Sequence, residues 1–376
     1  MAQPIRTSIA IIGGGCAGMS LAARLAEANG PDCIVLEAAP NFQGNRTWCF
    51  WDNGQASRWN LETDFSWPAW SLRKDGKEIV HRGSSYSYSG ISGESFFRQQ
   101  TAKIQASSNV RVILNSPVAA IKEDGALVFG PGEAGLVEAD LIVDTRPVSQ
   151  PDALLQHFLG WEVIVDEEIF DPTKAILMDF DVPQDRGLHF FYVLPFSAKR
   201  ALVEATVLSP SVWQRKAYEE ALLSYLKDRF RLEAEQFQII RRESGVLPMA
   251  RRETENSENC VLLGTVAGAM KASSGYAFPF IQSQADAMAE SILGGQKRPR
   301  TLKRGRLTAF MDDLFVEVLR RTPQRAPSFF RDIFFGTDAD QFARFMMDDA
   351  TMADRLAIVR SLPPGDFLAA LVDRVR

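Results

Sequence analysis

The sequence predicts an α/β protein with a parallel nucleotide-binding sheet, a later antiparallel sheet and a helical C-terminal part. Three observations lead to this prediction. A glycine-rich turn follows an apolar run near the N-terminus, strand-like runs dominate residues 148–250, and apolar residues recur at helical spacing after residue 303. The 376 residues exceed one ordinary domain, and an apolar content of 46% is enough for a sizeable core.

Composition excludes several classes of function. The net charge of −5 argues against nucleic acid as a main partner. No run of about 18 apolar residues is present, so we expect no transmembrane helix. Residues 1–7 lead directly into the first predicted strand and leave no room for a signal peptide, so we expect a cytoplasmic protein with reduced thiols. The three histidines and four cysteines show neither metal-ligand nor hydrolase-triad spacing, and we expect no metal site.

The glycine-rich turn fits the pattern G-x-G-x-x-G between a strand and a helix. Gly13 permits the tight turn out of the strand, and Gly15 lets a pyrophosphate approach the backbone. Gly18 allows the helix to pack closely on the strand. Cys16 and Ala17 lie where the helix begins, and its N-terminus faces the phosphates. The turn therefore predicts a dinucleotide site.

Two residues that follow the next predicted strand are further candidates for contacting the dinucleotide. Glu37 follows the apolar run Cys33–Leu36 and lies 24 residues beyond Gly13, close to the spacing of about 20 expected for the acid that binds the ribose. Arg46 follows in a turn-rich loop, where it either reaches a cofactor phosphate or ribose or is an ordinary solvated arginine.

The remaining segments complete a two-part organisation. The run Asp140–Asp144 returns to the nucleotide-binding sheet, and the run from Cys260 ends in a second glycine turn at Gly264. We therefore assign residues 1–147 and 251–300 to the nucleotide-binding domain. Residues 148–250 form a substrate domain, whose antiparallel sheet has one face on a cavity and the other under a helix at Ser211–Phe230. Residues 301–376 form a helical region.

One helix of this last region has a continuous apolar stripe. Its members are Phe310, Leu314, Phe315, Val318 and Leu319, and charged residues including Asp312 occupy the other side. The stripe faces either the protein core or a membrane surface.

Taken together, several motifs resemble the bacterial flavin-dependent lycopene β-cyclase family over most of the chain. They are Thr47–Phe50, Asp144–Arg146, Gln156–Glu162, Met178–Phe180, Phe191–Ser197, Leu202–Thr206, Glu243–Met249, Ser273–Phe278 and Phe310–Phe315. The resemblance implies an FAD-binding Rossmann-like domain of the glutathione-reductase/hydroxylase type. It also implies reduced FAD as cofactor, with NAD(P)H as the reductant, and redox-neutral cyclisation of lycopene to β-carotene in carotenoid biosynthesis.

The resemblance also implies further cofactor contacts. They are Asp144 and Arg146 after the returning strand, Gly264 in the second glycine turn, and Gly275 and Tyr276, where the family brings backbone against the flavin. Lys271, Ser273 and Ser274 are nearby candidates.

Cyclisation needs a strong acid in a dry pocket, because a terminal double bond must be protonated. Glu204 lies on an apolar strand, where burial would keep its carboxyl protonated, although a salt-bridged strand carboxylate is the alternative. Glu162 and Asp179 either relay or remove a proton, or only orient their neighbours. Ala205 stands where the family has a second acidic residue, so we expect no adjacent pair of carboxyls here.

Aromatic faces would accommodate the cation, and the candidates are Trp161, Phe191 and Tyr192, with Phe190 beside them; each is otherwise a core residue. A lipid-dissolved polyene further implies peripheral membrane association on the cytoplasmic side, through the C-terminal helices and the aromatic loops. Two rival functions stay open. They are an FAD-dependent monooxygenase or polyprenyl reductase acting on an apolar substrate, and a flavoprotein that only carries a polyene.

Overall fold

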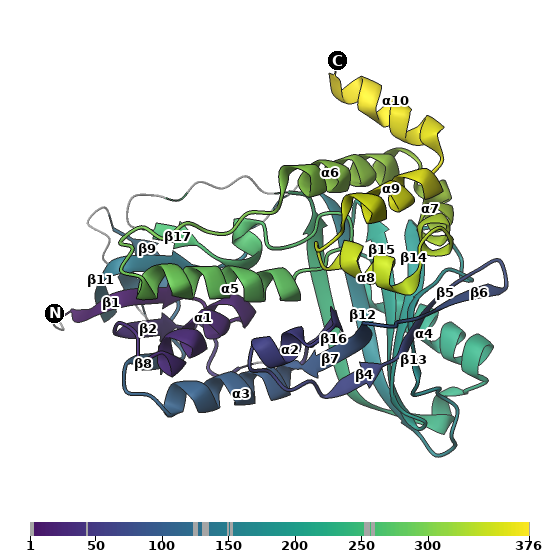
Figure 1. Cartoon of the computed structure of the whole chain (residues 1–376). Helices are drawn as coiled ribbons and strands as arrows, with labels where there is room; N and C mark the ends of the chain where they lie inside the picture. The colour runs from purple at the N-terminus through teal and green to yellow at the C-terminus, as the bar shows by residue number, and fades with distance from the viewer. Residues whose placement is uncertain are drawn as a thin grey trace.

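The computed structural model describes residues 4–42, 44–122, 127–129, 135–148, 150, 153–251, 256 and 260–375. Figure 1 shows one half, which contains the N-terminus and the sheet around β1, beside a second half in which a large sheet lies under the C-terminal helices.

The first sheet is mostly parallel. Its order is β8 (Val110–Ile113), β2 (Cys33–Leu36), β1 (Ile5–Ile12), β11 (Gly135–Asp144), β10 (Leu127–Phe129) and β9 (Val118–Ile121), with β17 (Cys260–Leu262) also paired to β11. The strands β8, β2, β1, β11 and β17 run parallel, as the glycine-turn motif requires. The strands β10 and β11 form an antiparallel pair in the register Leu127↔Val137, and β9 pairs with the other edge of β10.

Three helices pack on this sheet and on one another. They are α1 (Cys16–Glu27), α3 (Gly93–Gln105) and α5 (Phe278–Leu293). The helix α1 begins directly after the glycine turn, and its small buried residues let it lie against the strands. The helix α5 has Pro279 in its first turn, where proline favours the start of a helix.

The second sheet crosses the predicted domain boundary. Its order is β16 (Phe237–Met249), β12 (Leu154–Val165), β15 (Arg200–Ser209), β14 (Leu188–Ser197), β13 (Lys174–Asp179), β5 (Ala69–Lys74) and β6 (Lys77–Arg82). Residues 1–147 were assigned to the nucleotide-binding domain, but β5 and β6 extend this second sheet through a parallel pairing of β5 with β13. Their position in the sequence, between strands of the first sheet, therefore does not show that β5 and β6 belong to the second sheet.

A small third sheet connects the halves (Figure 1). It consists of β3 (Thr47–Asp52), β7 (Ser87–Ser92) and β4 (Phe65–Trp67), and the short helix α2 (Gln55–Arg58) follows β3.

The two faces of the second sheet are covered differently. Helix α4 (Arg215–Phe230) packs on one face, and its start lies four residues after the predicted Ser211. The C-terminal helices cover the other face; they are α6 (Arg306–Arg321), α7 (Ala326–Phe335), α8 (Ala339–Met346), α9 (Met352–Ser361) and α10 (Pro364–Val375). Both faces are thus buried. Within the described ranges, no helix is both long and apolar enough to cross a membrane.

The apolar stripe of α6 mostly faces the core. Phe315, Val318 and Leu319 are buried, which confirms the core-facing interpretation for them, whereas Phe310 is 42% exposed. Asp312 was assigned to the outer, charged side, but it is buried. That assignment was wrong because Asp312 has charged and hydroxyl partners inside the protein, which are described below.

Candidate active site

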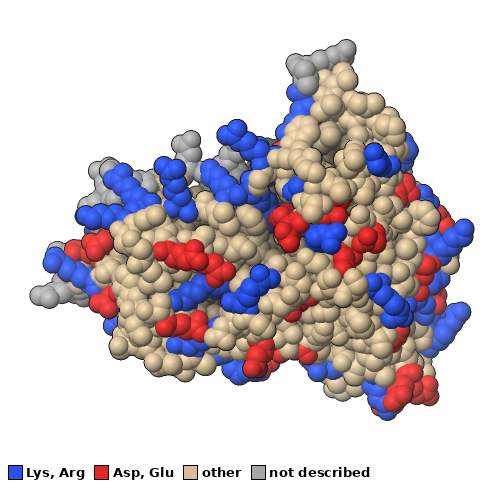
Figure 2. Space-filling view, viewed as in Figure 1, with Lys and Arg blue, Asp and Glu red and all other residues tan. Residues whose placement is uncertain are grey.

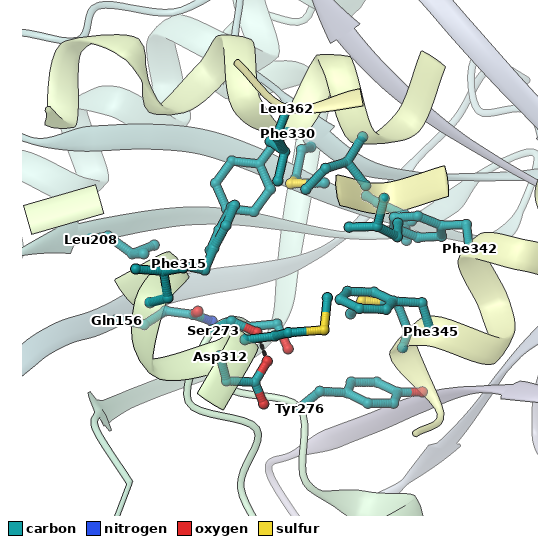
Figure 3. Close-up of a pocket in the computed structure, with 18 of the residues that line it drawn as sticks. Gln156, Leu208, Ser273, Tyr276, Asp312, Phe315, Phe330, Phe342, Phe345 and Leu362 are labelled. Carbon is teal, nitrogen blue, oxygen red and sulfur yellow. Dashed lines mark hydrogen bonds between the residues drawn. The ribbon is translucent and has the colours of Figure 1, made fainter. Parts of the chain in front are cut away.

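A cavity of about 490 Å³ lies between the second sheet and the C-terminal helices. Its walls are mainly apolar and aromatic. Figure 3 shows Phe315 of α6 and Phe330 of α7 pointing into it from one side, and Phe342 and Phe345 of α8 from another. The polar residues in the lining are few: Gln156, Glu204, Thr206, Ser273, Ser274 and Asp312, together with the phenols of Tyr88, Tyr192 and Tyr276.

Glu204 is a carboxyl-bearing residue of this lining. It lies on β15, is only 7% exposed, and accepts a hydrogen bond of 2.7 Å on its Oε1 from Thr206 Oγ1. Burial, together with the nearby carboxyl of Glu243, raises the pKa of Glu204 from 4.5 to about 8. Glu204 is therefore a buried carboxyl in the cavity wall whose surroundings favour the protonated form.

Glu243 is a buried carboxyl, in register with Gly160 next to Glu204, to which the sequence interpretation gave no role. It lies on β16, and its Oε2 accepts hydrogen bonds from Thr47 Oγ1 (3.0 Å) and Arg241 Nη1 (2.6 Å). Burial raises its pKa, while the Arg241 guanidinium and the Thr47 hydroxyl oppose that rise. The sequence contained one signal, because Glu243 opens a quoted family motif, but nothing linked it to Glu204.

Glu162 is buried but does not line the cavity. Its carboxylate is paired with Arg200, whose Nε lies 2.6 Å from Oε1, and with Arg241, whose Nε lies 2.6 Å from Oε2. Glu162 is thus an ionised partner of Arg241, and Arg241 in turn contacts Glu243.

Asp179 lies on the other face of the sheet, which contradicts the interpretation that it relays or removes a proton and leaves the interpretation that it only orients its neighbours. Its carboxyl accepts a 3.0 Å hydrogen bond from Tyr225 Oη of α4, and Arg229 of the same helix is 3.5 Å away. Burial raises its pKa, but it faces the packed layer under α4. Because alternate residues of a strand point to opposite faces of the sheet, a buried acid reaches the cavity only when its side chain points to the face that carries the cavity.

The same alternation places some of the predicted aromatic residues on the cavity face of the sheet and others on the face under α4. Tyr192 lines the cavity, and its hydroxyl lies 2.7 Å from that of Tyr88. Trp161 and Phe191 instead belong to the layer under α4, and the ring of Phe191 stacks at 3.8 Å on that of Tyr225. The structure therefore contradicts the pocket-lining interpretation of Trp161 and Phe191 and supports the alternative that they are core residues. Phe190 lines the cavity, and so does Trp51, which the prediction did not include.

The glycine turn forms an open cradle at the start of α1. Gly13 has a φ of +98°, and a Cβ at Gly18 would lie 2.0 Å from the Gly13 carbonyl oxygen, so both positions need glycine. A Cβ at Gly15 would meet no atom within 4 Å, which leaves the space that a pyrophosphate would take. Cys16 and Ala17 open the helix, as expected, and burial raises the pKa of the Cys16 thiol to about 12.

Glu37 and the Asp144–Arg146 pair lie beside this cradle. Glu37 accepts hydrogen bonds from the backbone N–H groups of Gly14 (2.5 Å) and Ala39 (2.8 Å) at the end of β2. Asp144 ends β11 next to Ile12 of β1, and Arg146 is paired with it at 2.7 Å. Arg46 is exposed, and its two interpretations stay open.

The segment from Gly264 to Tyr276 joins the cradle to the cavity. Gly264 has a φ of +84°, and a Cβ there would lie 2.7 Å from the Ala17 Cβ, so this turn packs on the start of α1. Gly275 has a φ of +72° and approaches Gln156 of the second sheet, while Tyr276 lines the cavity. Gly264, Gly275 and Tyr276 thus connect the glycine turn with the cavity that Glu204 lines.

A buried ionic cluster anchors this segment to the C-terminal helices. Lys271 is 1% exposed and lies 3.0 Å from Asp312 and 3.1 Å from Asp348. Ser273 donates a 2.6 Å hydrogen bond to Asp312, drawn dashed in Figure 3. Burial lowers the pKa of Lys271, and the Asp312 carboxylate opposes this. Lys271 therefore serves as an anchor behind the cavity wall.

Comparisons with known proteins agree with this arrangement. The family model described as "Lycopene cyclase protein" matches residues 8–371. A lycopene beta-cyclase from Pantoea ananas is 24% identical over 96% of this chain and 96% of its own length.

Two solved structures share the fold. A geranylgeranyl bacteriochlorophyll reductase-like protein from Thermoplasma acidophilum has a TM-score of 0.66 at 13% identity, covering 96% of each chain. A probable FAD-dependent monooxygenase from Pseudomonas aeruginosa has a TM-score of 0.59 at 14% identity, covering 91% of this chain and 100% of its own. These likenesses confirm the predicted FAD-binding Rossmann-like fold class.

Proposed function

The chain belongs to the lycopene cyclase family, and from this premise we propose that it closes β-rings at the ends of a linear carotenoid, converting lycopene to β-carotene. The observation that carries the proposal is the buried carboxyl of Glu204 in an otherwise largely apolar, aromatic cavity. An acid that stays protonated in a dry pocket is what protonation of a carbon–carbon double bond requires.

The reaction adds one proton and removes one proton. A proton added to the terminal double bond leaves a carbocation, which closes the six-membered ring, and loss of a proton then restores a double bond. Electrons and atoms balance without net oxidation. The protein must therefore supply an acid, a base, and surroundings that tolerate a positive charge.

Glu204 is the proposed acid. Its Oε1 accepts the Thr206 hydroxyl, so Oε2 is the oxygen that carries the proton. With a pKa of about 8, the carboxyl is protonated at neutral pH. The rings of Trp51, Tyr88 and Tyr192 line the same cavity and present electron-rich faces or hydroxyl groups to a developing cation.

FAD is the proposed cofactor, in its reduced form and with NAD(P)H as the source of electrons. The cradle at Gly13, Gly15 and Gly18 has the open space and the helix N-terminus that the pyrophosphate needs, and Glu37 lies where the ribose hydroxyls are expected. When bound, the reduced flavin supplies negative charge that stabilises a nearby cation, or supplies the proton itself.

We propose that the substrate enters from a membrane surface, at which the protein is peripherally bound on the cytoplasmic side. Val359 of α9 and Leu368 of α10 line the cavity and are each more than half exposed, so the cavity opens among exposed apolar side chains. Met352 and Val372 on the same two helices are also more than half exposed. Figure 2 shows the surface over α10 as largely uncharged in this view, which favours contact with lipid.

An anaerobic assay with lycopene, FAD and reductant tests the function. We expect ring-containing products from the wild type with only a catalytic amount of reductant, whereas a monooxygenase or a reductase would consume NAD(P)H in proportion to product. Glu204→Gln should lower the rate at least about 100-fold with FAD still bound. A wild type that makes no ring product under these conditions would refute the cyclase assignment, and an unchanged rate in E204Q would refute the acid.

A further inference from the structure

We propose that Glu243 is a second carboxyl of the active site, which shares one proton with Glu204 across a gap left by Gly160. This inference rests on the proposed function for its role in cyclisation, although the proton sharing can be measured without substrate. It concerns a residue and a glycine to which the sequence interpretation gave no role.

The sheet places the two glutamates on either side of a glycine in one row. In the register of β15, β12 and β16, Gly160 lies directly opposite Glu204 on one side and Glu243 on the other. The outer strands of such a triplet are about 10 Å apart, so two side chains meet only by reaching across the middle strand. Tyr192 of β14 continues the row next to Glu204.

The missing side chain of Gly160 makes this meeting possible. A Cβ at that position would lie 3.3 Å from Glu243 Cγ and 3.4 Å from Glu204 Cβ, which shows that both glutamates lean over the glycine on the same face. Besides burial, the charge of Glu243 accordingly raises the pKa of Glu204. Gly160 has no φ constraint that demands glycine, so this close approach is the physical reason for glycine here.

The partners of the two carboxyls are unequal, and this decides which of them is ionised. Glu243 accepts from the Arg241 guanidinium and from Thr47, and both contacts favour the carboxylate. Glu204 accepts only the neutral hydroxyl of Thr206 among the hydrogen bonds of the described residues. Glu204 is therefore the protonated member in the resting state, and Glu243 is the carboxylate.

Charge balance leads to the same assignment. The connected network contains two guanidinium groups, Arg200 and Arg241, and three carboxyls, Glu162, Glu204 and Glu243. Two cations neutralise two carboxylates, so the third carboxyl is buried without a countercharge and retains a proton.

The other titratable groups facing the pair do not alter this balance. Tyr192 comes from β14, Tyr88 from β7 and Cys49 from β3, and each senses the charge of the pair or of its neighbours. Burial raises the pKa of Cys49 to about 12 and raises the pKa values of both phenols well above their usual value of 10. All three are neutral near pH 7, so the pair is the titrating unit.

A shared proton suits a reaction that consumes and returns one proton. The O–H bond of Glu204 breaks as a C–H bond forms on the polyene, and the Glu204 carboxylate then faces the carbocation with the Glu243 carboxylate behind it. After ring closure a C–H bond of the cation breaks and the proton returns to the pair, which regenerates the starting state. Glu243 thereby acts through Glu204, as a positioning residue that raises the proton affinity of the acid.

Infrared difference titration of the FAD-bound protein, with the Glu204 carboxyl assigned by loss of its band in Glu204→Gln, tests the pair. Glu243→Gln keeps the shape but removes the charge, and we expect it to lower the titration midpoint of Glu204 by about one pH unit or more. Gly160→Ala, which separates the carboxyls, should lower the midpoint in the same direction. The alkaline limb of the cyclisation rate should move with the midpoint.

Asp179→Asn is the matched control, because it removes a buried carboxyl from the opposite face of the same sheet and should leave the Glu204 midpoint in place. A midpoint that is the same in wild type, E243Q and G160A would overturn the shared proton, even if ring products form. A shifted midpoint in a wild type that makes no ring product would support the pair and refute the cyclase assignment instead.

Discussion

Replacing Glu204 by glutamine removes the proposed catalytic acid, and the variant should be more stable than the wild type at alkaline pH. The carboxyl has a pKa of about 8 in the folded protein, against 4.5 as its ordinary value. Between these two values the folded protein holds a proton that the unfolded chain has released. The stabilisation from this proton is complete below pH 4.5 and is lost as the pH rises to about 8.

The magnitude follows from the width of that interval. Each pH unit contributes about 1.4 kcal/mol, so the two units between pH 6 and pH 8 remove about 3 kcal/mol from the unfolding free energy of the wild type. Since Glu243 titrates together with Glu204, this loss belongs to the proton that the pair holds. Glu204→Gln has no such proton to lose at this position.

Urea unfolding of both FAD-bound proteins at pH 6 and pH 9 provides the measurement. We expect the difference in unfolding free energy, variant minus wild type, to rise by about 3 kcal/mol between the two pH values. Glu220→Gln on the exposed side of α4 is the control, and its stability should follow that of the wild type. If wild type and E204Q show parallel pH dependence, Glu204 is not a protonated buried acid and the reasoning fails.

Three other changes test the cradle, the anchor and the membrane surface. Gly15→Val fills the open space of the cradle and should weaken FAD binding at least about tenfold, measured by flavin fluorescence titration. Circular dichroism should show that the apoprotein is still folded. An unchanged affinity would place the cofactor elsewhere. Lys271→Met removes the ammonium that pairs with the buried Asp312, while Asp348 keeps its ion pair with Arg304. The change should lower the unfolding free energy by about 3–5 kcal/mol in urea, and a loss below about 1 kcal/mol would contradict the anchor. The double change Met352→Asp and Val372→Asp should reduce flotation with liposomes severalfold, since it puts charges on the exposed apolar face, and equal flotation would argue against α9 and α10 as the contact.

The local features of the site could be predicted from sequence because each depends on neighbours in the chain. Gly13, Gly15 and Gly18 follow one another within a single turn, and the structure places them at the strand-to-helix junction that the motif requires. Glu204 could be found because an acid within an apolar run is unusual.

The sidedness of the second sheet could not be predicted in the same way. Helix α4 and the C-terminal helices bury both faces, so Trp161 and Phe191 on one face have the same apolar neighbours in sequence as Phe190 and Tyr192 on the other. Without a polar face, alternation shows that two faces exist but not which of them holds the cavity.

The amino-acid sequence alone therefore determined the fold class, the nucleotide turn and one candidate acid, since all three are encoded by residues within a few positions of one another. The tertiary structure alone decided that Glu204, Gly160 and Glu243 share a row, because strand register joins segments about 40 to 80 residues apart. It likewise decided that Asp312 is buried beside Lys271 and that Asp179 lies away from the cavity. These are matters of contact between distant segments, which local pattern does not specify.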